Sequence, residues 1–363
     1  MGKRRLLRAL PPSGSAHRWR RDRLGARAPR GARGGRVAVL LPPHRLLAAL
    51  GHPARQGAPA GAVGLRARAV DPALVSSFWC GKRVLVTGHS GFKGSWLCLW
   101  LASLGAEPVG FSEGSPTDPA LFDLSGMRTQ MRSVAGDIRE PEAVLRVVER
   151  ERPEVVFHLA AQSLVRRSLA SPVLTYEVNT MGTVNVLEAV RRTGDVRVFV
   201  NVTTDKCYEN REWVWGYREH EPLGGRDPYS SSKACAELIT SAYRASFADG
   251  DRPRIASARA GNVIGGGDFA EDRLIPDLMR GASRGQVVAV RNLGAMRPWQ
   301  HVLSPLSGYL LLAERLWGDI SLAGGWNFGP SDGDARTVRY IVERVAELWG
   351  EGLRWEVEQA PQP

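Results

Sequence analysis

Two residues spaced four apart, Tyr229 and Lys233, form a pair that can move a proton. On a helix this spacing places both side chains on one face. A nearby ammonium lowers the pKa of a phenol, so a tyrosinate can accept the proton of a substrate hydroxyl while a hydride leaves the same carbon. The pair therefore predicts redox chemistry at an alcohol or ketone.

A second polar run, Thr203-Thr204-Asp205-Lys206, directly follows an apolar segment typical of a buried strand. Open α/β sheets place their catalytic groups at this end of their strands. The run is therefore a candidate part of the active site. A solvated ion pair at a strand end is the alternative that these residues leave open.

A glycine-rich turn, Gly88-His89-Ser90-Gly91-Phe92-Lys93-Gly94, follows another apolar strand and opens a helix. Glycines in such a turn permit a tight bend, close approach of the backbone to a pyrophosphate, and packing of the helix on the sheet. The helix N-terminus adds amide donors and a favourable dipole. The turn predicts a dinucleotide site.

Single residues near these motifs admit simpler roles. An acid that binds the adenosine ribose is expected at the end of the second strand, but Ser112 stands there and Glu113 follows. This leaves the choice between NAD and NADP open. His158 ends a buried strand and is predicted to be structural. Cys207 has no neighbour that marks an activated thiolate and is predicted to pack as a small hydrophobe.

The elements that carry these motifs alternate between strand and helix. Apolar runs predict strands at 83–87, 107–112, 131–138, 154–160, 197–204 and 254–261, and helical spacing predicts helices at 92–104, 141–152, 172–192, 229–247 and 337–349, with a last strand at 353–357. This order predicts an α/β fold with a Rossmann-like, doubly wound parallel sheet. We expect an NAD-binding domain at 78–264 and a smaller substrate-binding region at 265–363.

The positive charge of the chain is confined to its N-terminal segment. Residues 1–70 hold 15 Arg and one Lys against one Asp, a charge of +15, so the remainder carries −3 although the whole chain carries +12. This composition predicts a disordered or mistranslated extension over residues 1–77. A basic nucleic-acid tail and a transit peptide are the alternatives. Four cysteines without metal-ligand spacing predict a reducing, cytoplasmic location and no metal. No apolar run reaches about 18 residues, which predicts no membrane span.

Motifs along residues 78–350 resemble one family. They are KRVLVTGHSGFKGSW, GDIRE, VFHLAAQ, VTTDKCYENREWVWGYRE, DPYSSSKACAE, ARAGNVIGGGD, RLIPD, RPWQHV and WNFGP. The chain is thereby identified as similar to the NAD-dependent nucleotide-sugar dehydratases of the extended short-chain dehydrogenase/reductase superfamily, most closely the CDP-glucose 4,6-dehydratases. The resemblance implies that the chain uses NAD and forms a homo-oligomer, a dimer or a tetramer. Such enzymes contribute to deoxysugar biosynthesis for surface polysaccharide.

The resemblance also implies roles for individual residues. Catalytic roles fall to Thr204, Asp205, Lys206, Tyr229 and Lys233. Cofactor binding falls to Gly88, Gly91, Phe92, Lys93, Gly94, Asp137, Ile138, Leu159, Ala160, Ala161 and Thr203, together with Tyr229 and Lys233. Substrate binding falls to Asn262, Arg273, Arg297 and His301. Trp213 and Trp215 either cover the sugar or pack a loop, and Gly265–Gly267 is predicted to be a substrate-side turn.

The implied reaction is an internal hydride transfer. Tyr229 takes the proton of the sugar C4 hydroxyl, Asp205 protonates the departing C6 hydroxyl, and Lys206 is placed to remove the C5 proton. An epimerase of the same fold would need no Asp205-Lys206 pair. An RNA-binding protein and an inactive homologue are further alternatives. Members of the family continue beyond the equivalent of Pro363, so we expect a chain shortened at its C-terminus.

Overall fold

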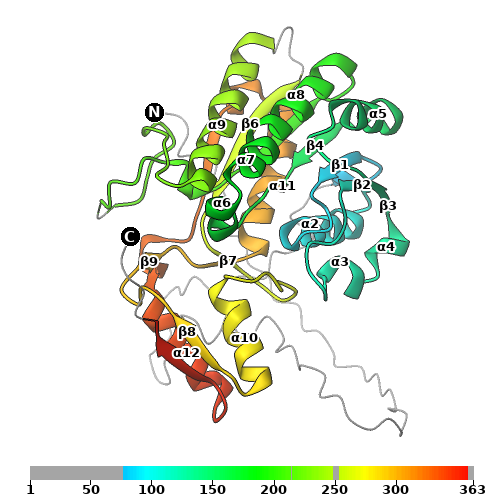
Figure 1. Ribbon diagram of the computed structural model, residues 1–363. Coiled ribbons are helices and arrows are strands. Elements are labelled where there is room, and N and C mark those ends of the chain that lie inside the picture. The colour runs from blue at the N-terminus through cyan, green and yellow to red at the C-terminus, as the bar shows by residue number, and fades with distance from the viewer. Residues whose placement is uncertain (1–76, 214, 248–252, 359–363) are drawn as a thin grey trace, which may run out of the picture. The chain divides into compact units, whose positions relative to one another are not determined.

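Seven parallel strands form the central sheet of the chain, in the order β11-β6-β5-β4-β1-β2-β3 (Figure 1). The structure is a computed structural model that describes residues 77–213, 215–247 and 253–358, so the Arg-rich segment and its predicted disorder lie outside the described residues. The strands are β1 (Arg83–Thr87), β2 (Glu107–Ser112), β3 (Arg132–Ala135), β4 (Val155–His158), β5 (Val198–Val202), β6 (Arg254–Ala260) and β11 (Gly325–Phe328). The predicted α/β fold with a parallel sheet is confirmed.

The central strands are buried because their side chains are apolar on both faces. All four residues of β4 and all five of β5 are buried, which is typical of a parallel sheet covered by helices on each side. Val86 of β1 pairs with Phe157 of β4 and with Gly110 of β2. Apolar burial along these strands supplies the main driving force for forming the sheet.

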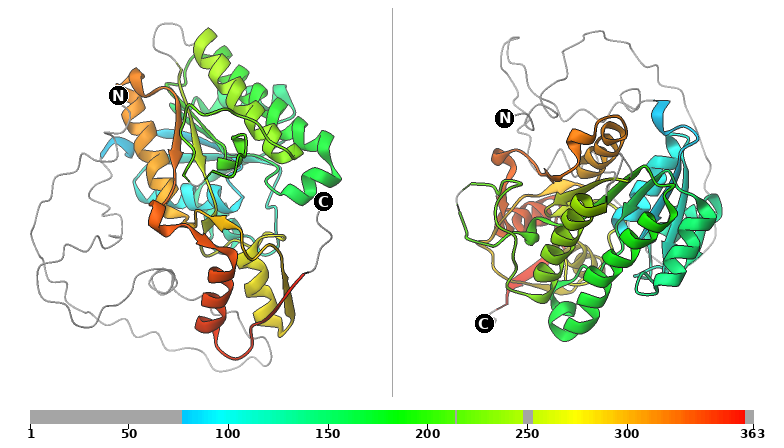
Figure 2. Two further views of the ribbon diagram at one scale, coloured as in Figure 1. Left: turned by 90° about the vertical axis from the view of Figure 1, so that its left-hand side faces the viewer. Right: turned by 90° about the horizontal axis from the view of Figure 1, so that it is seen from above.

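Helices cover the two faces of the sheet in separate groups (Figure 2). One group is α5 (Pro141–Glu151), α8 (Gly182–Thr193) and α9 (Pro228–Phe247), in which α8 contacts both neighbours. The other group is α2 (Phe92–Ser103) and α11 (Leu303–Gly318), which contact each other. Shorter helices are α3 (Leu121–Leu124), α4 (Met127–Gln130), α6 (Val165–Ala170) and α7 (Pro172–Tyr176).

The helix predicted at 172–192 is interrupted by a turn of different geometry. Glu177–Met181 forms a π-helical turn between α7 and α8. Asn179 within it donates through Nδ2 to Gln162 O at 2.9 Å and to Ser232 Oγ at 2.9 Å. The extra residue of a π turn aims this amide at two partners. The turn thus ties the loop after β4 to helix α9.

The predicted boundary implied that the region after residue 265 would be separate from the sheet. Part of this region instead adds a strand to the sheet. After β7 (Val263–Ile264) the chain passes through α10 (Leu274–Arg284), β8 (Val287–Val290), β9 (Met296–Arg297) and β10 (Gln300–His301). It then returns as α11 and β11, and β11 pairs with β6, Trp326 opposite Ala258. Strand β11 was not predicted, because its four residues, Gly-Trp-Asn-Phe, show no clear alternation of polar and apolar side chains.

A second hydrophobic core lies in the remaining part of this region. Helices α10 and α12 (Val338–Trp349) contact each other, and β8 pairs with β13 (Arg354–Val357), while β9 pairs with β12 (Arg336–Thr337). Leu278, Val288, Ile341 and Val342 are buried in this core. The substrate-binding role of this part stays a prediction.

Among the described residues, no helix is long and apolar enough to cross a bilayer.

Candidate functional site

The glycine-rich turn forms a cradle between β1 and α2 that a Cβ atom would fill. Gly88 has φ of +71°, and a Cβ there would lie 2.6 Å from Ala160 N in the loop after β4. A Cβ on Gly94 would lie 2.7 Å from His89 Cα. Gly91 is the N-cap of α2, and no side chain caps that helix within the described part of the chain. These residues fit a dinucleotide pyrophosphate at the helix N-terminus.

The strand end that lacks the expected acid carries an ion-pair cluster instead. Ser112 is turned to the glycine loop, 2.9 Å from Ser90 Oγ. Arg139 donates to Asp137 Oδ2 at 2.6 Å and lies 3.4 Å from Glu113 Oε1 and 3.6 Å from Glu177 Oε2. Burial raises the pKa of Asp137, but hydrogen bonds from Arg139 outweigh it and lower that pKa. Three carboxylates thus surround one guanidinium.

A cavity of about 370 Å³ opens beside this cluster, lined by Asp137, Arg139, Glu140, Glu177 and Met181. Ile138 does not line it, since its side chain is buried beneath Gly182, where a Cβ would lie 2.5 Å from Ile138 Cδ1. The predicted adenine contact of Asp137 agrees with this geometry, whereas Ile138 can shape the cavity only from beneath.

The predicted ribose-lining segment after β4 is held by β1. Leu159 N donates to Thr87 O at 3.1 Å, and Ala160 N donates to Thr87 Oγ1 at 3.2 Å. Next to them His158 is buried, with Nδ1 2.7 Å from Thr87 Oγ1 and Nε2 3.2 Å from Thr183 Oγ1. Burial lowers the pKa of His158 to about 3. The prediction of a structural histidine is confirmed.

Thr204, Asp205 and Tyr229 meet at the carboxyl end of β5. Thr204 Oγ1 donates to Asp205 Oδ1 at 3.0 Å, and the Thr204 side chain lies close enough to the Tyr229 hydroxyl to influence its pKa. Burial raises the pKa of Asp205, opposed by the Thr204 hydrogen bond and by the charges of Lys206 and Lys93. A carboxyl group with a raised pKa is suited to donate a proton. The structure therefore brings the two sequence motifs together.

Burial acts against the lowering of the Tyr229 pKa that the Tyr229-Lys233 spacing predicts. It raises the pKa of Tyr229 to about 12, opposed in part by the nearby Thr204 side chain. Burial also lowers the pKa of Lys233 to about 8, and Lys233 Nζ donates to Val202 O at 3.4 Å. Both shifts have one physical reason, since a buried site disfavours the charged form of each side chain.

The two other lysines of the motifs lie in different surroundings. Lys93, predicted to bind cofactor, has its pKa lowered to about 8 by burial, with a smaller contribution from Arg273, while the charge of Asp205 opposes this. Lys93 therefore reaches toward the catalytic cluster. Lys206 is exposed, and its Nζ lies 6.0 Å from the centre of the Tyr229 ring.

Backbone contact at Gly261 brings the segment after β6 close to the Asp205 carboxylate. A Cβ on Gly261 would lie 2.8 Å from Asp205 Oδ2 and 2.6 Å from Pro298 Cγ. Asn262 follows directly, and its carbonyl accepts from Gln300 N at 3.0 Å. The charge of Arg297 lowers the pKa of Asp205 against the larger effect of burial. Asn262 and Arg297 thus lie on the segments that close over Asp205.

Arg273 and His301 complete the predicted substrate residues. Arg273 donates to Asp268 Oδ2 at 3.0 Å and to Ser163 Oγ at 3.0 Å, and its charge acts on Tyr229. His301 Nδ1 accepts from Leu303 N at 3.3 Å, whereas its buried Nε2 has no hydrogen-bond partner among the described residues.

Three further sequence features have structural roles. Trp213 lies between Trp215 and Tyr217, with ring centroids 5.3 and 5.9 Å away, so these rings pack a loop. Gly266 O accepts from Trp96 Nε1 at 2.9 Å, which ties the glycine run 265–267 to α2. Cys207 is fully buried, and burial raises the pKa of its thiol, as expected for a packed hydrophobe.

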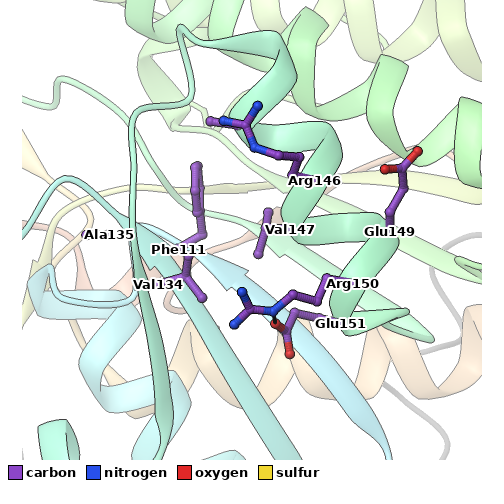
Figure 3. Close-up of a pocket in the computed structure, with 9 residues that line it drawn as sticks. Phe111, Val134, Ala135, Arg146, Val147, Glu149, Arg150 and Glu151 are labelled. Carbon is purple, nitrogen blue, oxygen red and sulfur yellow. Dashed lines mark hydrogen bonds and ion pairs between the residues drawn. The ribbon is translucent and has the colours of Figure 1, made fainter.

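A larger cavity of about 480 Å³ lies away from this chemistry. Figure 3 shows Phe111 of β2 and Val134 of β3 facing Val147 of α5 across it. Charged residues of α5 line its rim, and none of the predicted site residues does. The cavity is a gap beside the outer strand of the sheet.

Sequence reasoning missed several polar groups of this site. Glu237, one helical turn beyond Lys233, is 3 % exposed and accepts from Ser257 Oγ at 2.6 Å. The spacing of Tyr229, Lys233 and Glu237 by four was the available signal. No sequence pattern pointed to Tyr309 of α11. Its buried hydroxyl has no hydrogen-bond partner within the described residues.

The comparisons with known proteins agree with this arrangement. CDP-glucose 4,6-dehydratase of Salmonella typhimurium (strain LT2) is 52% identical over 293 residues, which cover 79% of this chain and 82% of that protein. A dTDP-glucose 4,6-dehydratase of Xanthomonas campestris is 29% identical over 229 residues, covering 60% of this chain and 64% of that protein.

Solved structures share the fold. UDP-glucose 4-epimerase of Thermus thermophilus, solved with NAD, has a TM-score of 0.64 and 28% identity, covering 76% of this chain and 85% of that one. DesIV of Streptomyces venezuelae, a dTDP-glucose 4,6-dehydratase with NAD bound, has a TM-score of 0.65 and 23% identity, covering 76% and 85%. The sequence profile of the GDP-mannose 4,6-dehydratase family matches residues 85–360. The chain therefore belongs to the GDP-mannose 4,6-dehydratase family.

Proposed function

We propose that the chain converts CDP-glucose to CDP-4-keto-6-deoxyglucose with NAD as a tightly held cofactor, a step of deoxysugar biosynthesis. The observation that carries the proposal is the half-buried Asp205 carboxyl, which accepts a hydrogen bond from Thr204 Oγ1 at 3.0 Å close to the Tyr229 hydroxyl. An oxidoreductase or epimerase has no use for a proton donor at this position. The cytidine nucleotide rests on the 52% identity with the Salmonella typhimurium enzyme.

The chain's own residues divide the proton transfers. Tyr229 accepts the proton of the C4 hydroxyl, and Thr204 donates a hydrogen bond to the ketone oxygen that forms. The ketone acidifies the C5 proton, and Lys206 is the base that removes it in this proposal. Asp205 then protonates the C6 hydroxyl, which leaves as water. NAD held by the Gly88–Gly94 turn would accept the hydride from C4 and supply it to C6, and the proton taken up by Lys206 would return to C5, so the overall reaction is a loss of water without net redox change.

In this proposal the substrate is bound by charged and polar side chains around the cluster of Thr204, Asp205 and Tyr229. Arg297 and Arg273 carry guanidinium groups suited to the pyrophosphate oxygens, although Arg273 is held by Asp268 in the protein alone. His301 Nε2 and the side chain of Asn262 are further contacts in this proposal. The Gly88–Gly94 turn would hold the pyrophosphate of NAD, and the Asp137 carboxylate its adenosine.

A homo-oligomer in the cytoplasm forms part of the proposal. Leu169 of α6, Val173 of α7 and Leu238 of α9 are 63%, 69% and 58% exposed, and these three helices contact one another. Exposed apolar side chains on neighbouring helices fit an interface between copies of the chain. The four free cysteines at 80, 98, 207 and 235 fit a reducing compartment. Sedimentation velocity of Val173→Glu, expected to be monomeric, tests the interface.

The experiment that tests the function uses the purified chain with NAD and CDP-glucose. We expect a 4-keto product, detected by its absorbance in alkali, and a lower rate with dTDP-glucose, UDP-glucose or GDP-mannose. A 4-epimer of the sugar without a ketone would replace the dehydratase by an epimerase. Absence of any change in each substrate would contradict both activities.

A further inference from the structure

Helix α9 carries a third ionisable group on the face that holds the catalytic pair. Tyr229, Lys233 and Glu237 are spaced by four residues, and each is at most 8 % exposed. A buried carboxylate is costly unless its oxygens are hydrogen-bonded or paired with a cation. The contacts of Glu237 therefore indicate why this position carries a charge.

The Glu237 carboxylate accepts from two neighbouring strands. Thr203 Oγ1, at the end of β5, donates to Oε1. Ser257 Oγ and Arg259 Nη2, both on β6, donate to Oε2 at 2.6 Å each. Thr203 precedes the catalytic Thr204-Asp205 pair, so this carboxylate fixes the backbone from which the pair projects.

Arg259 extends the same network to the segment beyond the catalytic pair. Its Nη1 donates to Tyr208 Oη at 2.7 Å and to Glu219 O at 2.9 Å. Tyr208 Oη in turn donates to Asn327 Oδ1 of β11 at 2.7 Å. The catalytic segment is thus anchored on both sides, by Thr203 before it and by Tyr208 after it.

The charge of Glu237 also acts on Lys233. Burial lowers the pKa of Lys233 to about 8, and the Glu237 carboxylate is the largest influence that opposes this. Burial raises the pKa of Tyr229 to about 12, so the tyrosine needs a positive charge nearby to lose its proton. Lys233 supplies that charge only while it stays protonated.

We propose that Glu237 is a positioning residue of the catalytic site, which holds the Thr203–Asp205 segment in place and keeps Lys233 in its charged form. The proposal rests on the proposed roles of Tyr229 and Lys233. It adds a residue that touches neither substrate nor cofactor and acts through a hydrogen bond to Thr203 and through its charge on Lys233.

Two readouts test the charge of Glu237. The chain has five lysines, so NMR of lysine labelled with ¹³C at Cε can follow Lys233 through a pH titration, with Lys233→Arg for assignment. Glu237→Gln keeps the shape but removes the charge, and should lower the Lys233 midpoint by about one pH unit or more. The alkaline limb of the kcat profile should move to lower pH by the same amount, because neutral Lys233 no longer assists Tyr229.

Matched variants separate charge from packing. Ser257→Ala removes one hydrogen bond to the same carboxylate and keeps its charge, so the Lys233 midpoint should stay unchanged. Thr203→Val removes the link to the catalytic segment, and should lower kcat about tenfold with the same Lys233 midpoint. Melting temperatures of each variant identify any loss of folding.

The outcomes are distinguishable. An unchanged Lys233 midpoint in folded Glu237→Gln overturns the role of the charge, whether or not the enzyme turns over CDP-glucose. A wild-type value of kcat in Thr203→Val overturns the role of Glu237 in positioning the Thr203–Asp205 segment. This test does not depend on whether Glu237→Gln folds. Absence of turnover in the wild type, with the Lys233 midpoint lowered in Glu237→Gln, contradicts the proposed function but not the effect of Glu237 on Lys233.

Discussion

At the scale of single residues, burial decides which groups of the site can carry charge. Burial raises the pKa of Tyr229 and of Asp205 and lowers the pKa of Lys233, so in each case it favours the neutral form of the side chain. For Lys233 and Asp205 these shifts bring the charged and neutral forms closer in energy near neutral pH, which suits groups that exchange protons, whereas the shift of Tyr229 makes its ionisation harder. Each group then depends on specific neighbours for its charge, Thr204 for Asp205 and Glu237 for Lys233.

Replacing Asp205 by Asn should separate the two halves of the reaction. Tyr229 and Lys233 remain, so oxidation at C4 should proceed and NADH should accumulate on the enzyme, while product formation falls by ~10²–10⁴. Stopped-flow absorbance of NADH and the alkali assay measure the two halves. Asp195→Asn, an exposed partner of Arg152, serves as the matched control. Loss of NADH formation in folded Asp205→Asn would assign Asp205 to the first half-reaction.

The Glu113–Arg139 contact should influence the choice between NAD and NADP. A negative charge beside the adenosine ribose repels the additional phosphate of NADP, and Glu113→Gln removes one of the three carboxylates that compete with that phosphate for Arg139. Because the Glu113 side chain is 70% exposed, we expect only about twofold to fivefold tighter NADP binding. Titration calorimetry with both cofactors measures this. The exposed Glu142→Gln on α5 is the control, and equal changes in both variants would contradict the prediction.

At the scale of elements, the active site depends on close approach of backbones. The turn into α2 packs on the loop after β4 at Gly88, and the segment after β6 packs on Asp205 at Gly261. Parallel strands end at one edge of the sheet, so the loops from β1, β4, β5 and β6 converge there. Glycine is required where two of these loops touch.

Replacing Gly94 by Ala should destabilise the protein and weaken its binding of NAD. The added Cβ would lie 2.7 Å from His89 Cα within the turn, so the backbone must shift. We expect a loss of about 1–3 kcal/mol in the free energy of unfolding. Gly318→Ala at the end of α11 meets no atom within 4 Å and should be neutral or slightly stabilising. Urea denaturation of both variants tests this, and similar free energies would show that the turn can adapt.

At the scale of the whole molecule, two buried histidines make stability depend on pH. Burial lowers the pKa of His158 to about 3 and that of His89 to about 4, from 6.5. His89 lies on the glycine turn, with Nε2 2.7 Å from Ser133 Oγ of β3. Both rings are thus held neutral between elements of the sheet, and protonation of either would break their hydrogen-bonded arrangement.

Stability should fall as the pH drops from 6.5 toward about 4. In this window the unfolded chain binds a proton at each histidine whereas the folded chain does not, so each ring costs about 1.4 kcal/mol per pH unit. His158→Gln should reduce this slope by the contribution of one ring, while the exposed His220→Gln should leave it unchanged. Urea denaturation at several pH values measures the slope. An identical slope in all three proteins would show that His158 is protonated in the folded state.

The sequence alone determined strands β1 to β6 of the central sheet, the dinucleotide turn and the Tyr229-Lys233 pair. Each of these depends on residues that are adjacent or one helical turn apart, and apolar runs or glycine spacing report such local structure directly. The resemblance to the family was also recognised from short contiguous motifs. Even the error at 172–192 was local, since a π turn adds one residue without changing the apolar pattern.

Tertiary structure decided what depends on partners distant in sequence. The pairing of β11 with β6, the contact of Arg139 with Glu113, and the network of Glu237 with Thr203 and Arg259 join separate segments. The direction of the Tyr229 pKa shift was also decided there, because it depends on how many atoms exclude water from the hydroxyl. Spacing in the sequence fixes which side chains share a helix face, but burial and charge at that face come from the strands packed against it.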